Sequence, residues 1–261
     1  PLIITNGHTD SAYEWTLMKI RQEVMVGVLA VDLLCALASI VIFSINIAKG
    51  VTPLWSVIFA ACTVVAYIGL FFVCNFKVLS PGANDNLTGV FVAVSALKCL
   101  KESGIRYENT EVCALLTGSE EAGLRGATAF TKRHKGENKD VETYIIAFDT
   151  MRDYDYMTIY HRDMTGMVKN SPEVVALLDE ACNDPDVNHP LPHGVVPFGA
   201  SDAAAFSRGG FKAAAVAGQN PKYAPYYHNR RDTPDQMIPE TFALGLDIAL
   251  AAIEAFDRDQ K

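Results

Sequence analysis

The sequence predicts an α/β fold, a three-layer sandwich with a mainly parallel central sheet, interrupted near its start by two apolar helices. Three observations predict this fold. After Lys77, short apolar runs alternate with helical patterns, which is typical of a parallel sheet covered on both faces. Ligand-type polar residues follow the predicted strands, as at the carboxyl edge of such sheets. Two long apolar runs break the pattern between residues 24 and 76.

Each element follows from a local pattern of apolar residues. Residues 2–5 form a short apolar run that predicts a buried first strand. Residues 86–102 carry apolar side chains at helical spacing and are followed by Gly104, a helix-ending residue. Residues 239–256 show the same spacing behind a proline in the first turn. The same criteria predict strands at 112–116, 143–148, 157–160 and 212–217 and helices at 122–134, 172–181 and 201–207.

The two apolar runs predict a transmembrane helical hairpin. Residues 24–48 contain Asp32 as their one charged residue, residues 54–76 contain none, and a short Gly- and Pro-containing link separates them. At about 1.5 Å per residue, each run makes a helix long enough to cross a bilayer. Two helices buried in a soluble core or lid are the alternative, although soluble helices usually keep a polar face. The predicted division is an α/β domain at 1–22 and 78–261 and a hairpin at 23–77.

Charge and cysteine content narrow the function classes. The net charge of −8 argues against a nucleic-acid partner, because phosphate binding needs a basic surface. Six cysteines form no CxxC pair, which fits a reducing compartment better than a disulfide framework. Lys19, Arg21 and Lys77 flank the hairpin on the domain side while Lys49 alone lies in the link, which predicts a cytoplasmic α/β domain. The chain starts at Pro1 without an initiator Met, so we expect residues upstream.

Residues that can bind a metal stand where the predicted strands end. Imidazole and carboxylate groups are ligands that zinc, manganese and cobalt accept. Taken singly they have structural alternatives, such as a helix cap, a solvated turn or a surface loop. Together they predict a metal site, because the carboxyl ends of parallel strands meet at one edge of the sheet. The candidates are His8, Asp10, Asp85, Glu120, Glu121, Asp149 and His228.

Five short segments also carry a family resemblance: Gly7-His8-Thr9-Asp10-Ser11, Gly82-Ala83-Asn84-Asp85-Asn86, Gly118-Ser119-Glu120-Glu121-Ala122-Gly123, Phe148-Asp149 and Tyr227-His228. In this order they resemble the zinc aminopeptidase family that includes bacterial leucyl aminopeptidases and, more distantly, glutamate carboxypeptidase and glutaminyl cyclase. The resemblance implies a zinc exopeptidase fold. The interval from His8 to Asp85, 77 residues (85 − 8), is longer than usual in the family, and the hairpin accounts for the excess.

The resemblance implies two zinc ions, with manganese or cobalt as other suitable metals. Their five ligands would be Asp85 bridging both ions, His8 and Asp149 on one ion, and Glu121 and His228 on the other. Glu120 would be the general base that takes a proton from the water between the metals. Asp10 would orient the His8 ring. The family often has a cis peptide bond after the bridging aspartate, which predicts one between Asp85 and Asn86.

The expected substrate contacts depart from the family at one position. Phe198 stands where several relatives have a tyrosine hydroxyl that helps to hold the oxyanion. Tyr226, Tyr227 or the metals alone would then do that work. Arg230 would contact a peptide carboxylate or belong to a solvated arginine pair. We therefore expect Tyr227, Phe198 and Arg230 at the substrate.

The combined prediction is a membrane-anchored dinuclear zinc exopeptidase, most simply an aminopeptidase, that acts on peptides and contacts the bilayer through residues 24–76. Two alternatives remain open. One is a relative of the same fold with another substrate, such as a carboxypeptidase or glutaminyl cyclase. The other is a non-catalytic membrane scaffold, which the retention of every expected residue from His8 to His228 disfavours.

Overall fold

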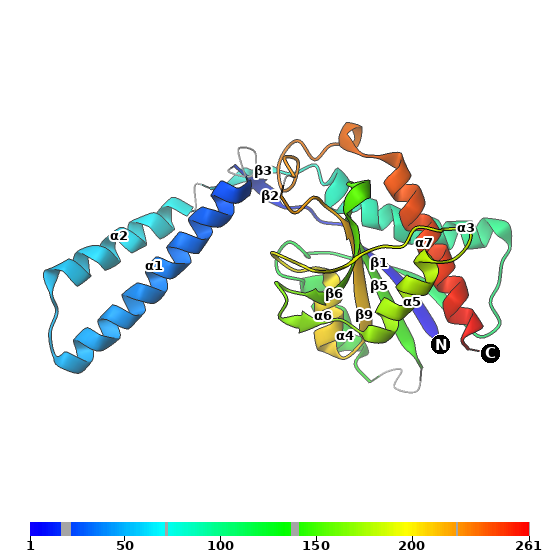
Figure 1. Ribbon diagram of the computed structural model, residues 1–261, viewed down its shortest axis with the longest axis horizontal. Helices are drawn as coiled ribbons and strands as arrows, with labels where there is room; N and C mark the ends of the chain where they lie inside the picture. The colour runs from blue at the N-terminus through cyan, green and yellow to red at the C-terminus, as the bar shows by residue number, and fades with distance from the viewer. Residues whose placement is uncertain (17–21, 71–72, 137–140, 223, 261) are drawn as a thin grey trace. The chain divides into compact units, whose positions relative to one another are not determined.

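The computed structural model describes residues 1–16, 22–70, 73–136, 141–222 and 224–260 (Figure 1). The chain divides into two compact units. The α/β unit comprises Pro1–Ala12, Pro81–Pro221 and Asp232–Lys261, and the helical unit comprises Tyr13–Ser80 and Lys222–Arg231. The helical unit is therefore wider than the predicted hairpin and includes a short segment from the C-terminal part of the chain. Lys19 and Arg21, on which the predicted sidedness partly rests, lie outside the described residues.

A seven-stranded sheet forms the centre of the α/β unit, in the order β4-β1-β5-β9-β6-β7 with β8 beside β6. The four strands β4, β1, β5 and β9 are parallel to one another, and β6 runs antiparallel to β9 and β7. The mainly parallel sheet predicted from the sequence is confirmed. The strands are β1 (Leu2–His8), β4 (Glu111–Thr117), β5 (Thr143–Met151), β6 (Met157–Asp163), β7 (Val168–Lys169), β8 (His193–Val195) and β9 (Lys212–Gly218).

Helices cover both faces of this sheet, as Figure 1 shows. One face packs against α3 (Thr88–Ser103), α5 (Pro172–Cys182) and α7 (Pro239–Arg258), and the other against α4 (Arg125–His134) and α6 (Asp202–Gly209). Successive residues of a strand point to opposite faces, so each central strand contributes to both cores. On β5, Ile146 and Phe148 enter the first core, and Ile145 and Ala147 enter the second. Two cores flanking one sheet make the predicted three-layer sandwich. Two short 3₁₀ helices complete the unit, at Tyr154–Tyr156 and Pro234–Gln236.

Several elements begin or end away from their predicted bounds. The first strand continues past residue 5 to His8, which places a candidate ligand on the strand itself. The helix expected at 86–102 begins at Thr88, because Ala83–Leu87 forms a π-type turn, η1, with non-helical backbone inside it. The side chain of Asn86 then accepts the Gly89 N–H at 2.9 Å, as a helix cap does.

The helical unit contains two apolar helices, α1 (Gln22–Lys49) and α2 (Leu54–Leu70), and two short strands. The predicted second span, 54–76, is too long, because Cys74–Leu79 forms strand β3, which pairs antiparallel with β2 (Tyr13–Trp15). Within the described residues, one helix is long and apolar enough to cross a membrane, over Val24–Lys49. Because α2 is shorter, a hairpin with two full spans stays a prediction.

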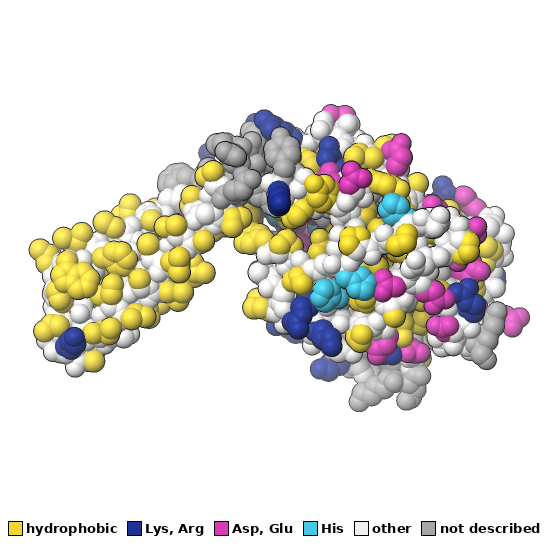
Figure 2. Space-filling model, viewed as in Figure 1, with side chains coloured by type: hydrophobic (Ala, Val, Ile, Leu, Met, Phe, Trp, Pro, Cys, Tyr) yellow, Lys and Arg dark blue, Asp and Glu magenta, His cyan; other side chains and the backbone are white. Residues whose placement is uncertain are grey.

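Polar side chains of α1 and α2 face each other, whereas apolar side chains face outward. Asn46 donates to Ser56 at 3.0 Å, and Ser39 and Thr63 share a hydrogen bond at 3.3 Å. Figure 2 shows the outer surface of the two helices covered with hydrophobic side chains. This arrangement is the reverse of that in a water-soluble helical pair.

Candidate metal centre

The parallel strands of the α/β unit bring three predicted site residues to one edge of the sheet, and η1 adds a fourth. His8 is the last residue of β1 and stands in register with Thr117, the last residue of β4. Glu120 follows β4 by three residues, and Asp149 lies near the end of β5. Asp85 comes from η1. The edge-of-sheet position expected from the strand ends is therefore occupied by these side chains.

The imidazole of His8 faces three carboxylates. Its Nε2 atom lies 3.2 Å from Asp85 Oδ1, 3.8 Å from Asp149 Oδ1 and 3.9 Å from Glu120 Oε2. His8, Asp85 and Glu120 are all buried. Three carboxylates with so little solvent around one imidazole repel one another unless a positive charge lies between them.

A divalent metal fits this cluster. His8 Nε2 and Asp149 Oδ1 are buried and, within the described residues, make no hydrogen bond of acceptable geometry, despite the short approach of Asp85. An unsatisfied buried polar atom costs about 1–3 kcal/mol, so such atoms in a native structure require a partner. One donor atom from each of His8, Glu120 and Asp149 lies within 4.8 Å of the others. One imidazole with several carboxylate oxygens is a donor set that zinc accepts.

Asp85 and Glu121 make a second, adjacent pair of oxygens in the α/β unit, within 4.8 Å of each other. The backbone N–H groups of Asn84 and Asp85 donate to the carboxylate of Asp232 at 2.7 and 3.0 Å. These bonds fix the turn that presents Asp85. The peptide bond between Asp85 and Asn86 is cis, as predicted. Sequence reasoning missed Asp232, whose partners lie almost 150 residues earlier in the chain.

Asp10 makes contacts beyond the one predicted with His8. Its carboxylate accepts the backbone N–H groups of Glu120 and Glu121 at 2.9 and 3.1 Å. The Nδ1 atom of His8 lies 3.1 Å from the main-chain carbonyl of Asp10 and 3.6 Å from its carboxylate. Asp10 therefore contacts the His8 ring through both its carbonyl and its carboxylate, and the same carboxylate holds the Glu120–Glu121 turn.

The buried charges shift the pKa values of the cluster. Burial raises the pKa of Glu120 well above its usual range; the charge of His8 opposes this rise, and the charges of Asp149 and Glu121 add to it. Burial also raises the pKa of Asp149. Burial lowers the pKa of His8, but the carboxylates of Asp10, Asp149 and Asp85 outweigh it and leave that pKa well above the usual value. A metal ion that binds His8 must displace the proton from the imidazole ring, because metals bind the neutral imidazole.

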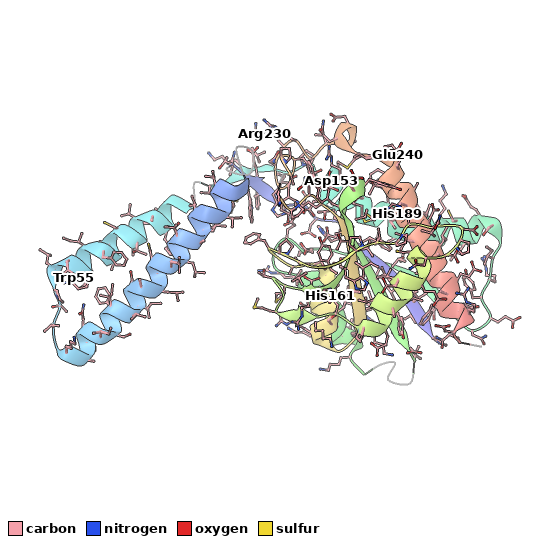
Figure 3. All side chains as sticks on the ribbon, in the orientation of Figure 1. Trp55, Asp153, His161, His189, Arg230 and Glu240 are labelled. Atoms are coloured by element: carbon pink, nitrogen blue, oxygen red, sulfur yellow. The ribbon has the colours of Figure 1, made fainter. Side chains whose placement is uncertain are left out.

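The remaining predicted residues lie in the helical unit or at the surface. His228 belongs to the Lys222–Arg231 segment of the helical unit, where Tyr227 stacks on its ring with centroids 3.8 Å apart. Its role as a ligand stays a prediction. Arg230, labelled in Figure 3, forms two hydrogen bonds with Glu14, so its guanidinium is already paired. Phe198 is half-exposed, at 49%.

A second buried carboxylate near the strand ends was not among the predicted site residues. Thr117 donates its hydroxyl to Asp202, the first residue of α6, and accepts a hydrogen bond from Asn6 at 3.2 Å. Burial raises the pKa of Asp202 to about 6. The Ser201-Asp202 pair was visible in the sequence, but its bond to Thr117 depends on packing between α6 and the sheet.

Comparisons with solved structures agree with this architecture. An aminopeptidase from Aneurinibacillus sp. strain AM-1 superposes with a TM-score of 0.56 and 26% identity, covering 67% of this chain and 39% of its own. The zinc aminopeptidase BSAP of Bacillus subtilis gives 0.56 and 22%, covering 67% and 42%. A glutaminyl cyclase from Bacteroides thetaiotaomicron gives 0.51 and 13%, covering 69% and 65%.

The chain spans half or less of the length of the aminopeptidases that it resembles. No curated protein matches the sequence. The sequence does match peptidase family M28, over residues 68–253. This range starts within α2 and therefore leaves out β1 and His8, on the other side of the apolar insertion. Because it covers well over half of the sequence, the chain belongs to peptidase family M28.

Proposed function

We propose that this chain is a membrane-anchored, zinc-dependent aminopeptidase. The observation that carries the proposal is the buried cluster in which His8 Nε2 faces the carboxylates of Asp85, Asp149 and Glu120 within 3.9 Å. A purely structural cluster of this kind would leave several buried charges uncompensated. Membership of a peptidase family and the zinc aminopeptidase among the structural relatives support zinc as the compensating ion.

We propose two zinc ions that share Asp85. His8 and Asp149 would complete the ligand set of one ion, and Glu121 and His228 that of the other. The distances favour Asp85 over Glu120 as a ligand beside His8, because Asp85 approaches Nε2 more closely, at 3.2 against 3.9 Å. Glu120 is then free for proton transfer. The ions would supply Lewis acidity toward the scissile carbonyl and lower the pKa of a nearby water.

Glu120 is suited to act as the general base. In the cluster without metal, burial raises the pKa of this carboxyl group, which is the direction that a base working at neutral pH needs. The Asp10 carboxylate fixes the position of Glu120 by accepting its backbone N–H, so the base is held on a rigid turn. The same carboxyl group, once protonated, can deliver the proton to the leaving amine.

The structural relatives include enzymes with two different activities, and the proposal must distinguish between them. Aminopeptidases are among them, and so is a glutaminyl cyclase, which is the second candidate. The carboxyl pair at Asp85 and Glu121, beside the first cluster, favours two metal positions. Two zinc ions are what the resemblance to the aminopeptidases implies, so this pair favours the aminopeptidase. A non-catalytic scaffold is disfavoured, because it has no need to keep these carboxylates buried.

The membrane anchor is proposed from the helical unit. Its outward apolar side chains include Ile47 at 75% and Leu54 at 72% exposure, which lipid would cover. Trp55 lies at the link end of α2 (Figure 3), and Lys49 ends α1, so both can reach the far interface. Lys77 lies at the opposite end. We propose that the α/β unit is cytoplasmic, so protease added outside intact cells should leave it uncut.

Metal content and activity together test the proposal. The full chain, purified in detergent, should contain two zinc ions and hydrolyse an aminoacyl arylamide. Glu120→Gln should keep its zinc but lose at least about a hundredfold in kcat, in line with removal of a general base. Glu240→Gln, at an exposed site in the first turn of α7, is the matched control and should keep full activity. Absence of zinc from the purified chain, with no activity restored by added zinc, would contradict the proposal.

A further inference from the structure

The segment that carries His228 is built into the helical unit. That unit contains α1, α2, the strands β2 and β3, and Lys222–Arg231. Strand β2 has only three residues, and it pairs with β3 through Glu14 opposite Asn75 and Trp15 opposite Cys74. A strand this short contributes little by its own pairing. Its contacts with the His228 segment therefore need an explanation.

Trp15 contacts His228 through both its backbone and its ring. The Trp15 N–H donates to the His228 carbonyl at 2.8 Å. The indole meets the imidazole edge-on, with ring centroids 4.8 Å apart and planes at 87°. Tyr227 stacks on the His228 ring, with centroids 3.8 Å apart. The orientation of the His228 ring is thus set by aromatic neighbours.

Glu14 holds the same segment through an ion pair in which the carboxylate is buried and the guanidinium is exposed. Its side chain is 1% exposed and accepts two hydrogen bonds from Arg230, from Nε at 2.7 Å and from Nη2 at 2.6 Å. A two-point contact between guanidinium and carboxylate fixes direction as well as distance. Burial of one member makes the geometry costly to give up, because an unpaired buried charge is strongly destabilising.

The segment itself is locally ordered around a left-handed residue. His228 has φ of 51°, a conformation that few residues other than glycine adopt without support. Asn229 supplies internal bonds, donating to the carbonyls of Pro225 at 2.9 Å and Tyr227 at 3.0 Å. Ser80, just after β3, donates to the Asn229 carbonyl at 3.0 Å. The segment is therefore held at two neighbouring residues, His228 by Trp15 of β2 and Asn229 by Ser80 just after β3.

We propose that β2 is a positioning element for a metal ligand: Glu14, through Arg230, and Trp15, directly, fix His228 in its ligating orientation. The inference rests on the proposed function, in which His228 binds the second zinc ion. It gives Arg230 a positioning role, in place of the contact with a peptide carboxylate that the sequence suggested.

The test compares zinc affinity at the two sites in the full chain. The variants are Glu14→Gln, Arg230→Gln and the double variant, with Arg230→Lys as the conservative change. Glu180→Gln is the matched control, because Glu180 forms a glutamate–arginine pair with Arg258 that is exposed on both sides. Readouts are zinc per chain in a series of zinc buffers, kcat and KM at each zinc level, and the unfolding midpoint.

The expected result is selective loss of one zinc. Glu14→Gln should weaken one of two sites about 10- to 100-fold, the usual effect of removing a group that orients a ligand. Activity should return at saturating zinc with KM unchanged, which loss of general stability would not produce. The double variant should bind zinc no more weakly than the single variant with the lower affinity, because both single changes remove the same contact. The zinc affinity of Arg230→Lys should lie between those of the wild type and Arg230→Gln, because lysine keeps the positive charge but cannot make the two-point contact with the carboxylate.

Two outcomes would overturn the inference and are distinct from failure of the proposed function. Two zinc ions bound to Glu14→Gln with unchanged affinity would show that β2 does not position His228. Equal weakening of both sites would show a general structural effect instead. If Glu14→Gln does not fold, Trp15→Phe and Arg230→Lys decide the question by the same readouts. A wild-type chain that binds no zinc would instead refute the proposed function.

Discussion

Replacing Asp202 by asparagine should make the stability of the zinc-free protein less sensitive to pH. Asp202 is 2% exposed, and burial raises its pKa to about 6, with the charge of Asp149 adding to the rise and the Thr117 hydroxyl partly opposing it. An unfolded aspartate titrates near pH 3.9, or about 2 units lower. Between about pH 4 and pH 6, Asp202 is therefore more protonated in the folded chain than in the unfolded chain.

The sign and size of the effect follow from proton linkage. Because the folded state holds the extra proton, the free energy of unfolding falls as pH rises through this window. Each unit of difference is worth about 1.4 kcal/mol, so ionisation of Asp202 should cost roughly 3 kcal/mol by pH 7.5. Asp202→Asn keeps an oxygen that can accept the Thr117 hydroxyl and carries no charge at any pH. Its stability relative to the wild type should rise by that amount between pH 4 and pH 7.5.

The assay is guanidinium unfolding of the chelated, zinc-free protein in detergent, followed by circular dichroism at pH 4, 6 and 7.5. Asp186→Asn, at an exposed position after α5, is the control and should show no such trend. A difference between Asp202→Asn and the wild type that stays constant across these pH values would refute the reasoning. So would a difference that shrinks as pH rises, because it would mean that the buried carboxylate prefers to be ionised.

Two further predictions concern the metal centre. Asp232→Ala removes the acceptor of the Asn84 and Asp85 N–H groups. The free energy of unfolding should therefore fall by roughly 2–5 kcal/mol, and the zinc content should drop. Unchanged zinc affinity would contradict the role given to Asp232. Zinc should dissociate as pH falls through the raised pKa of His8, because the proton and the metal compete for Nε2. The measurement is zinc affinity by dialysis against buffered zinc. An affinity that does not change with pH would show that His8 is not a ligand.

The parts of the fold that could be predicted are those whose signal is local. Long helices such as α3 and α7 repeat apolar residues at helical spacing, and β5 and β9 are apolar runs bounded by turns. Strands β2 and β7 have three and two residues, too few to show any period, and exist because a partner strand is present. The end of α2 was missed for the same reason. The uncharged run continues past α2 to Phe76, and pairing with β2 makes Cys74–Leu79 a strand.

The candidate site divides along the same line. His8, Glu120 and Asp149 were predictable, because each stands at or just after a strand end and parallel strands share an edge. Asp232 and Glu14 were not, because their partners lie 148 and 216 residues away in the chain and no local pattern marks such pairs. The additional contacts of Asp10 were missed for a similar reason. Only the folded chain shows that its carboxylate meets the Glu120 and Glu121 amides.

The position of the apolar insertion argues against a simple anchor. An anchor attached at one end of an enzyme can be removed without touching the site. Here the insertion lies between His8 and Asp85 in the sequence, and the unit that contains it also contains the His228 segment. Replacing α1 and α2 by a short polar loop should therefore preserve zinc binding only if β2 and β3 remain paired. Loss of one of the two proposed zinc ions in a version that also lacks β2 and β3, but not in one that keeps them, would separate membrane attachment from assembly of the metal centre.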